Sequence, residues 1–139
     1  MEFCKRTIVV IGPGGASRRA LQLSLNLEGY GVHAADGTGE ARRLIDEHWP
    51  EAVVIDISEG SPDILNLVRD IRQSRFHRHI VIVASAPIAR AEQERSAYEA
   101  GCDAFVIQAG HTRELAELLE AYLPASTEIA QETRAQRWN

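Results

Sequence analysis

Five short apolar runs, each followed by a longer amphipathic segment, constrain the fold of this chain more than any other feature of its sequence. Four of the runs are rich in Val and Ile and do not alternate with polar residues. Strands of that kind are buried on both faces, as in a parallel sheet that is covered by helices on either side. A fifth, weaker run is typical of an edge strand. The runs are Thr7–Ile11, Gly31–Ala35 (the weaker one), Ala52–Ile57, Ile80–Ala84 and Ala104–Ile107.

The segments between the runs carry apolar residues at helical spacing. Helices are expected from about 17 to 28, around 41–48, from about 62 to 71, over 88–100 and around 115–122. Glycine or proline follows four of them, as it does at helix ends: Gly29, Pro50, Gly101 and Pro124. Strand and helix therefore alternate five times, which predicts an α/β fold with a central parallel sheet and helices on both faces.

Length and composition limit the function classes. The 139 residues predict one domain over 1–123, followed by a polar tail or the start of a linker over 124–139. Lys plus Arg number 15 against 20 Asp plus Glu, and this net charge of −5 argues against binding to nucleic acid or an anionic membrane. The longest apolar run is too short to cross a bilayer, and no signal peptide opens the chain. Cys4 and Cys102 are expected to be reduced thiols of a cytoplasmic protein.

The carboxyl ends of the strands carry the candidate functional residues, because ligands of open α/β sheets gather at that edge. Asp56 is the anomaly there. It interrupts an apolar run, so its carboxylate is expected at the rim of a buried sheet, where an unpaired charge is costly. Chemistry alone leaves two interpretations open: a functional carboxylate, or an acid that caps nearby backbone amides.

Four motifs taken together are more specific than Asp56 alone. They are Val-Val-Ile-Asp-Ile around Asp56, Ala-Ala-Asp-Gly at 34–37 with Glu-Ala at 40–41, Ile-Val-Ile-Val-Ala-Ser at 80–85, and Glu-Ala-Gly-Cys-Asp-Ala-Phe at 99–105. In this order and spacing, over about residues 6–123, the chain resembles the receiver domain of two-component response regulators. The resemblance implies a single doubly wound, flavodoxin-like (βα)5 domain.

The expected strand order is 2-1-3-4-5, with the first and fifth helices on one face of the sheet and the other three on the opposite face. Right-handed crossovers and the weak second run favour this order, which the resemblance also implies. By the same resemblance, Asp56 stands where receivers accept a phosphoryl group. Ser85 matches the hydroxyl residue that binds the phosphoryl group, and Phe105 matches the switch aromatic of the fifth strand.

Four positions depart from the receiver pattern. Receivers carry an acidic pair directly after the first strand, which holds a magnesium ion, and a lysine at the end of the fifth strand, usually before a cis proline. The degenerate positions here are Gly12, Pro13, Gln108 and Ala109. Magnesium prefers six oxygen ligands in octahedral geometry, so its binding is expected to be lost, and no cofactor is expected. Glu59, in the loop after the third strand, is a single acid and is not expected to replace the pair.

These departures predict a pseudo-receiver: a phosphorylation-independent protein-interaction module of a bacterial two-component or phosphorelay pathway, and not an enzyme. Its partners would be proteins, such as a histidine kinase, another regulator, or a second copy bound through the fourth helix, fifth strand and fifth helix. The fourth helix has few large core residues and is expected to be the least tightly packed. Its candidate interface residues are Arg90, Glu94, Arg95 and Tyr98.

Two alternatives stay open. The first is a degenerate but functional phosphoacceptor that uses Asp56. The second is a small nucleotide- or anion-binding domain on the Gly12–Gly15 loop, because this loop follows a strand and Asp36 lies about 20 residues further on, as in dinucleotide-binding folds. The match is imperfect, since Ser17 occupies the position of the third glycine.

Other conspicuous residues are expected to be structural. His77 and His79 lack a third ligand and are expected in solvent rather than on a metal. Cys102 is expected to be an inert, packed thiol. The paired arginines of the first two helices are expected to be solvated: Arg18, Arg19, Arg42 and Arg43.

Overall fold

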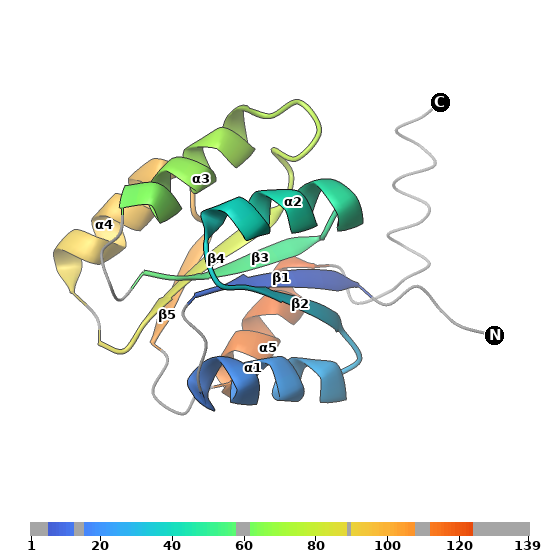
Figure 1. The fold of residues 1–139 in the computed structure, drawn as a ribbon. Helices are drawn as coiled ribbons and strands as arrows, with labels where there is room; N and C mark the ends of the chain where they lie inside the picture. Colours follow the sequence, from blue (N-terminus) through green and yellow to red (C-terminus); the bar gives the residue numbers. More distant parts are fainter. Residues whose placement is uncertain (1–5, 13–15, 58–61, 89, 108–111, 124–139) are drawn as a thin grey trace.

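A computed structural model describes residues 6–12, 16–57, 62–88, 90–107 and 112–123. At its centre is a five-stranded sheet in the order β2-β1-β3-β4-β5, in which all neighbouring strands are parallel (Figure 1). The expected fold class and strand order are confirmed. The strands are β1 (Thr7–Ile11), β2 (Gly31–Ala35), β3 (Ala52–Asp56), β4 (Val81–Ala86) and β5 (Ala104–Ile107).

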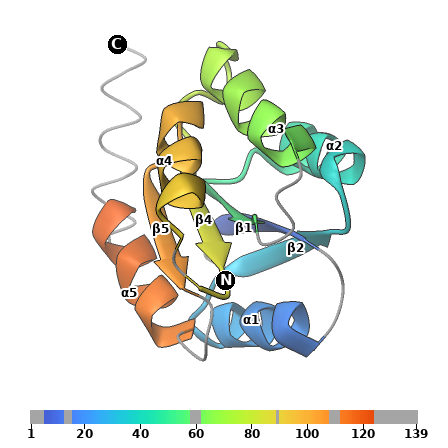
Figure 2. The same ribbon diagram turned by 90° about the vertical axis from the view of Figure 1, so that its left-hand side faces the viewer.

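Helices cover both faces of the sheet. Those of the described ranges are α1 (Ala16–Leu27), α2 (Thr38–His48), α3 (Pro62–Gln73), α4 (Ala91–Ala100) and α5 (Thr112–Tyr122). Helices α1 and α5 lie on one face and α2, α3 and α4 on the other, which confirms the expected distribution (Figure 2).

One hydrophobic cluster lies on each face of the sheet, and the strands contribute side chains to both clusters. Ile8 and Val10 of β1 belong to the cluster beneath α1 and α5, whereas Val9 and Ile11 belong to the cluster beneath α2, α3 and α4. Successive side chains of a strand point to opposite faces. Both faces of β1 are therefore apolar, and this explains why its sequence shows no polar alternation.

Several element boundaries differ from the expectation, including the start of β4, which is Val81 rather than Ile80. Strand β4 runs to Ala86 rather than Ala84, because it pairs with β5 as far as Ala86 opposite Ile107. Strand β3 ends at Asp56 rather than Ile57. Helix α4 begins at Ala91 rather than Ile88, since Arg90 has an extended backbone and stands at the N-cap.

Helix α4 contributes only small side chains to the buried core. Its fully buried residues are Ala97 and Ala100, whereas α3 buries Leu67, Val68 and Ile71. Burial of a methyl group removes far less apolar area from water than burial of a leucine or isoleucine side chain. The hydrophobic contribution of α4 to stability is therefore small, in agreement with the few large core residues that its sequence offers.

Arg72, near the end of α3, ties three segments together. Its guanidinium donates hydrogen bonds to the carbonyl of Ile80 at 2.6 Å and to the carbonyl of Gly101 at 2.7 Å. It also forms an ion pair with Asp103 at 2.6 Å, and the same carboxylate oxygen accepts the amide of Ile82 at 2.8 Å. The start of β4 and the turn between α4 and β5 are thus held to α3 by one partly buried cation.

None of the helices in the described ranges is long and apolar enough to cross a membrane. The expected tail over 124–139 lies outside the described residues, so the boundary at residue 123 stays a prediction.

Replacing Arg72 with methionine is expected to lower the free energy of unfolding by about 2 kcal/mol, because three carbonyls (Arg78, Ile80 and Gly101) and the carboxylate of Asp103 lose this donor. Arg69→Met is the matched control, since Arg69 is exposed and bonds only within its own helix, to Asn66. Urea unfolding followed by circular dichroism measures both changes. Equal effects of the two substitutions would contradict the role given to Arg72.

Candidate functional site

Asp56 and Ser85 stand side by side at the carboxyl edge of the sheet. Asp56 is the last residue of β3, and the parallel register places it opposite Ser85 of β4. Ser85 is buried, and its hydroxyl donates a hydrogen bond to the carbonyl of Ile55 at 3.1 Å. The structure thus brings together the phosphoacceptor-equivalent aspartate and the switch-equivalent hydroxyl that the sequence predicts.

Gly12, directly after β1, lies unusually close to Asp56. A Cβ atom placed on Gly12 would be 2.8 Å from the Cβ of Asp56, a separation that real side chains do not tolerate. The amide of Gly12 donates to the carbonyl of Ala35 at 3.0 Å, which fixes this backbone against β2 as well. The side chain of Asp56 therefore occupies the space into which a side chain at position 12 would project.

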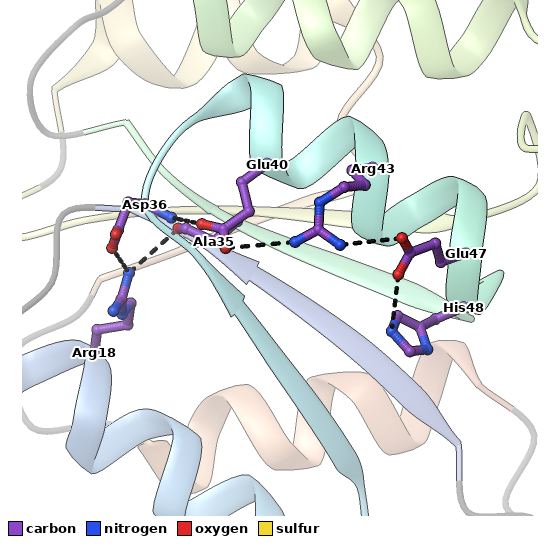
Figure 3. A network of polar contacts seen from close by, with 7 residues as sticks. All are labelled: Arg18, Ala35, Asp36, Glu40, Arg43, Glu47 and His48. Carbon is purple, nitrogen blue, oxygen red and sulfur yellow. Dashed lines mark hydrogen bonds and ion pairs between the residues drawn. The ribbon is translucent and has the colours of Figure 1, made fainter.

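Arg18 of α1 holds the neighbouring ends of β1 and β2 (Figure 3). One of its terminal nitrogens, Nη1, donates to the carbonyl of Gly12 at 2.9 Å and to that of Ala35 at 3.3 Å, and pairs with Asp36 at 2.5 Å. The side chain of Arg18 is only 22% exposed. A fixed positive charge thus lies at the strand ends, and the prediction that Arg18 is solvated is wrong.

A chain of polar contacts continues from Asp36 along the exposed side of α2 (Figure 3). The Asp36 amide donates to Glu40 at 3.0 Å, and Arg43 lies between Glu40 at 3.7 Å and Glu47 at 3.0 Å. Arg42 also forms an exposed ion pair, with Asp70 of α3 at 2.6 Å. These pairs are open to solvent and each contributes little to stability.

The described residues do not provide the ligands that a magnesium ion needs at this edge. Gly12 has no side-chain oxygen, its close contact with Asp56 leaves no room for one, and Arg18 already brings a cation to the same loops. No group of three or more His, Cys, Asp or Glu suited to a metal occurs in the part of the chain that the structure describes. Position 12 therefore supplies no ligand for a receiver-type metal site, and the loss of Mg²⁺ binding stays a prediction.

Phe105, the switch-equivalent aromatic, is partly buried in β5 beside Ala84 of β4. It packs against the hydrophobic cluster beneath α2, α3 and α4. Phe105 thus lies in the fifth strand, the position that the resemblance implies for the switch aromatic. The degenerate positions Pro13, Gln108 and Ala109, and the acid Glu59, lie outside the described residues.

Two contacts bear on the nucleotide-binding alternative. In a dinucleotide site the acid after β2 binds the ribose, and backbone amides of the glycine loop approach the phosphates. Here Asp36 forms an ion pair with Arg18, and the Gly12 amide donates to Ala35. Both groups are therefore already engaged within the protein. Residues 13–15 of that loop lie outside the described residues.

The candidate interface residues lie on α4 and at its start. Arg90 is the exposed N-cap residue, Arg95 is exposed, and Glu94 is partly buried. Tyr98 is 45% exposed, and burial, followed by the nearby Glu94 carboxylate, raises the pKa of its hydroxyl. These side chains form an accessible surface at α4, and their role as an interface stays a prediction.

His77 departs from the expectation that it lies in solvent. Its side chain is only 11% exposed, lies 3.1 Å from Asp46, and packs edge-on against Trp49. His79 is exposed, as expected. Cys102 is buried and unpaired with another cysteine, and burial raises the pKa of its thiol to about 12, which agrees with an inert, packed residue. Cys4 lies outside the described residues.

Sequence comparison relates the chain to response regulators. It is 28% identical over 120 residues to the response regulator MprA of Mycolicibacterium vanbaalenii, covering 86% of this chain and 51% of that protein. It is 23% identical over 123 residues to the virulence transcriptional regulatory protein PhoP of Salmonella typhimurium, covering 88% of this chain and 54% of PhoP. The chain thus spans about half the length of the curated relatives it matches. No family model matches it.

Solved structures with the same fold are also response regulators. A putative response regulator from Chloroflexus aurantiacus superposes with a TM-score of 0.80 at 21% identity, covering 86% of this chain and 98% of that one. A two-component response regulator of the LuxR family from Aurantimonas has a TM-score of 0.75 at 27% identity, and the match covers 98% of this chain and 100% of that one. The resemblance to receiver domains that the sequence motifs indicate is confirmed.

The contact between Gly12 and Asp56 leads to a stability prediction. Gly12→Ala is expected to lower the free energy of unfolding by about 1–3 kcal/mol, because the added methyl group must displace the end of β1 or β3. Gly39→Ala is the matched control: Gly39 lies within α2, and a Cβ there meets nothing within 4 Å. That substitution is expected to stabilise the protein by up to about 1 kcal/mol. Thermal and urea unfolding measure both, and a neutral Gly12→Ala would contradict the close packing.

Proposed function

We propose that this chain, a receiver-type domain related to those of response regulators, acts as a phosphorylation-independent protein-interaction module and not as an enzyme. The observation that carries the proposal is the contact of Gly12 with Asp56, because it leaves no room for the acidic side chain that would hold a metal ion. In this proposal Asp56 is retained as a structural residue at the strand end, and Mg²⁺ binding is lost.

The energetics of phosphoryl transfer support this function. Transfer to an aspartate depends mainly on positioning and on stabilisation of the charge of the transferred group. A phosphoryl group adds about 1.5–2 negative charges. The sequence supplies neither the acidic pair for a cation nor a lysine at the end of β5, where Gln108 stands. A neutral amide forms a hydrogen bond only about half as strong as a charge-assisted one.

The hydroxyl of Ser85 also has a partner in the structure as described. It donates to the Ile55 carbonyl, within the sheet itself. In a switching receiver the hydroxyl of this position is drawn to the phosphoryl group, and the following loop moves with it. Without a metal ion and a lysine, a phosphoryl group would be poorly held at Asp56. The Ser85 hydroxyl would then keep its hydrogen bond to the Ile55 carbonyl, so the domain is proposed to keep one conformation.

Its partners are proposed to be proteins of a two-component or phosphorelay pathway: a histidine kinase, another regulator, or a second copy of the chain. The proposed surface consists of α4, β5 and α5, with Arg90, Glu94, Arg95 and Tyr98 on the α4 side. The small core contribution of α4 supports this choice, since a loosely anchored helix adapts to a partner at low cost. The acidic net charge of −5 argues against direct contact of this domain with nucleic acid.

The decisive experiment offers the protein a phosphoryl donor. After incubation with acetyl phosphate and millimolar magnesium, intact-mass spectrometry is expected to show no phosphorylated protein, and beryllofluoride is expected to leave the amide NMR spectrum unchanged. A receiver that has the acidic pair and the lysine, treated in parallel, shows that the reagents are active. A stoichiometric adduct that is absent from Asp56→Asn would instead establish a degenerate phosphoacceptor.

A further inference from the structure

An exposed aromatic patch lies at the edge of the sheet where the strands begin, opposite the candidate site. We define the aromatic patch by three residues: Trp49, after α2, and Phe76 and His77, between α3 and β4. The Trp49 ring packs edge-on against Phe76 and against His77, with centroids 5.9 Å and 4.9 Å apart. Yet Trp49 is 56% exposed and Phe76 is 66% exposed. Aromatic side chains are enriched at protein interfaces, because covering a ring removes a large area from water.

The aromatic patch is held in place by contacts within the chain. His77 is only 11% exposed and lies 3.1 Å from the carboxylate of Asp46, so it joins the loop before β4 to α2 and supports the Trp49 ring. Trp49 itself caps α2 in the left-handed region, at φ 48° and ψ 60°. Glycine is preferred at such a C-cap, so local stability does not explain a tryptophan there. Rings that are already held in one arrangement lose little freedom when a partner covers them.

The two sides of the aromatic patch have opposite charge. On the α2 side, residues 43–51 carry three carboxylates against one arginine; on the loop side, residues 74–80 carry two arginines and no carboxylate. The carboxylates are those of Asp46, Glu47 and Glu51, and the loop arginines are Arg75 and Arg78.

The carboxylates of the α2 side have partners within the chain. Asp46 is paired with His77, Glu47 with Arg43 at 3.0 Å, and Glu51 is partly buried and engaged. The pair of Glu47 and Arg43 is exposed, and pairs of that kind contribute little and can change partners at low cost. Arg75 and Arg78 are exposed. Glu47 is therefore the acid of this side that is best placed to contact a basic group of another molecule.

We propose that the aromatic patch binds the same patch of a second copy of this chain. A two-fold axis that runs between the two sides, through the rings, places the acidic side of each copy against the basic side of the other. Trp49 and Phe76 of the two copies then cover one another. A ligand of one charge sign would meet like charge on one side of the patch, whereas a second copy meets opposite charge on both. This self-complementarity favours a second copy as the occupant.

The size of the aromatic patch predicts a weak dimer. Complete burial of an aromatic side chain removes about 150–250 Å² from water. Trp49 and Phe76 are little more than half exposed, so two copies together cover on the order of 500 Å² of ring surface. Even with the flanking charged side chains, the interface is smaller than the roughly 1,200 Å² at which stable interfaces begin. The dimer therefore exchanges with the monomer. The proposal is independent of the function proposed above, because it involves neither Asp56 nor the surface at α4.

Sedimentation velocity of the full chain, at concentrations up to about 1 mM, measures the dimer directly. The unmodified chain is expected to show a reversible monomer–dimer equilibrium. Phe76→Asp is expected to raise the dissociation constant by roughly tenfold or more, because it removes a central ring and places a charge between the others. Leu27→Asp is the matched control, since Leu27 is 81% exposed on α1, outside the patch, and is expected to leave the constant unchanged. Circular dichroism should show that both variants stay folded.

Charge reversal tests the two-fold arrangement itself. Glu47→Lys places a cation opposite Arg75 and Arg78 of the other copy, and Arg75→Glu with Arg78→Glu places carboxylates opposite Glu47. Each variant alone is expected to associate more weakly than the unmodified chain. An equimolar mixture of the two is expected to form a mixed dimer, because opposite charges then meet on both sides of the patch.

Four results would overturn the proposal. The first is a chain that stays monomeric over the whole concentration range. The second is an equal effect of Phe76→Asp and Leu27→Asp, and the third is a mixture of the charge variants that associates no more tightly than either alone. The fourth concerns α4: Arg95→Glu is expected to leave the dimer unchanged. If it dissociates the dimer while Phe76→Asp does not, the two copies meet at α4 instead.

Discussion

The close approach of Gly12 to Asp56 is the constraint on which the whole carboxyl edge of this sheet depends. Because position 12 has no side chain, the end of β1 lies directly against β3, where a Cβ would be 2.8 Å from that of Asp56. The same backbone is then fixed from two sides, by Ala35 of β2 and by the guanidinium of Arg18. The end of β1 is thus held by backbone contacts and by an arginine.

The two edges of the sheet thus have different chemistry. At the carboxyl edge, polar groups are engaged with one another: Arg18 with Asp36, and Ser85 with Ile55. At the opposite edge, Trp49 and Phe76 leave much of their rings exposed. Groups that already have partners within the protein must be separated before they can bind a ligand, whereas an exposed ring gains by being covered. Exposed side chains are therefore easier for a ligand to bind than the engaged groups around Asp56.

Much of the fold could be predicted because its buried strands occur in the sequence as short, continuous runs of apolar residues. Strands β1, β2 and β5 begin and end as expected, and Asp56 was found because a carboxylate interrupts such a run. Arg18 was missed because its acceptors, Gly12, Ala35 and Asp36, converge on it only after β1 and β2 have paired. The burial of His77 depends in the same way on Asp46 and Trp49, distant residues whose approach no local pattern reveals.

The central proposal, that the carboxyl edge holds no cation site, is tested most directly by titrating the protein with Mn²⁺ and following its amide resonances. A bound paramagnetic ion broadens the resonances of nearby amides and leaves distant ones sharp. The account predicts that Gly12, Asp56 and Ser85 broaden no more than exposed amides elsewhere in the domain, at any millimolar concentration. Selective, saturable broadening of these three amides, reversed by Mg²⁺, would contradict it.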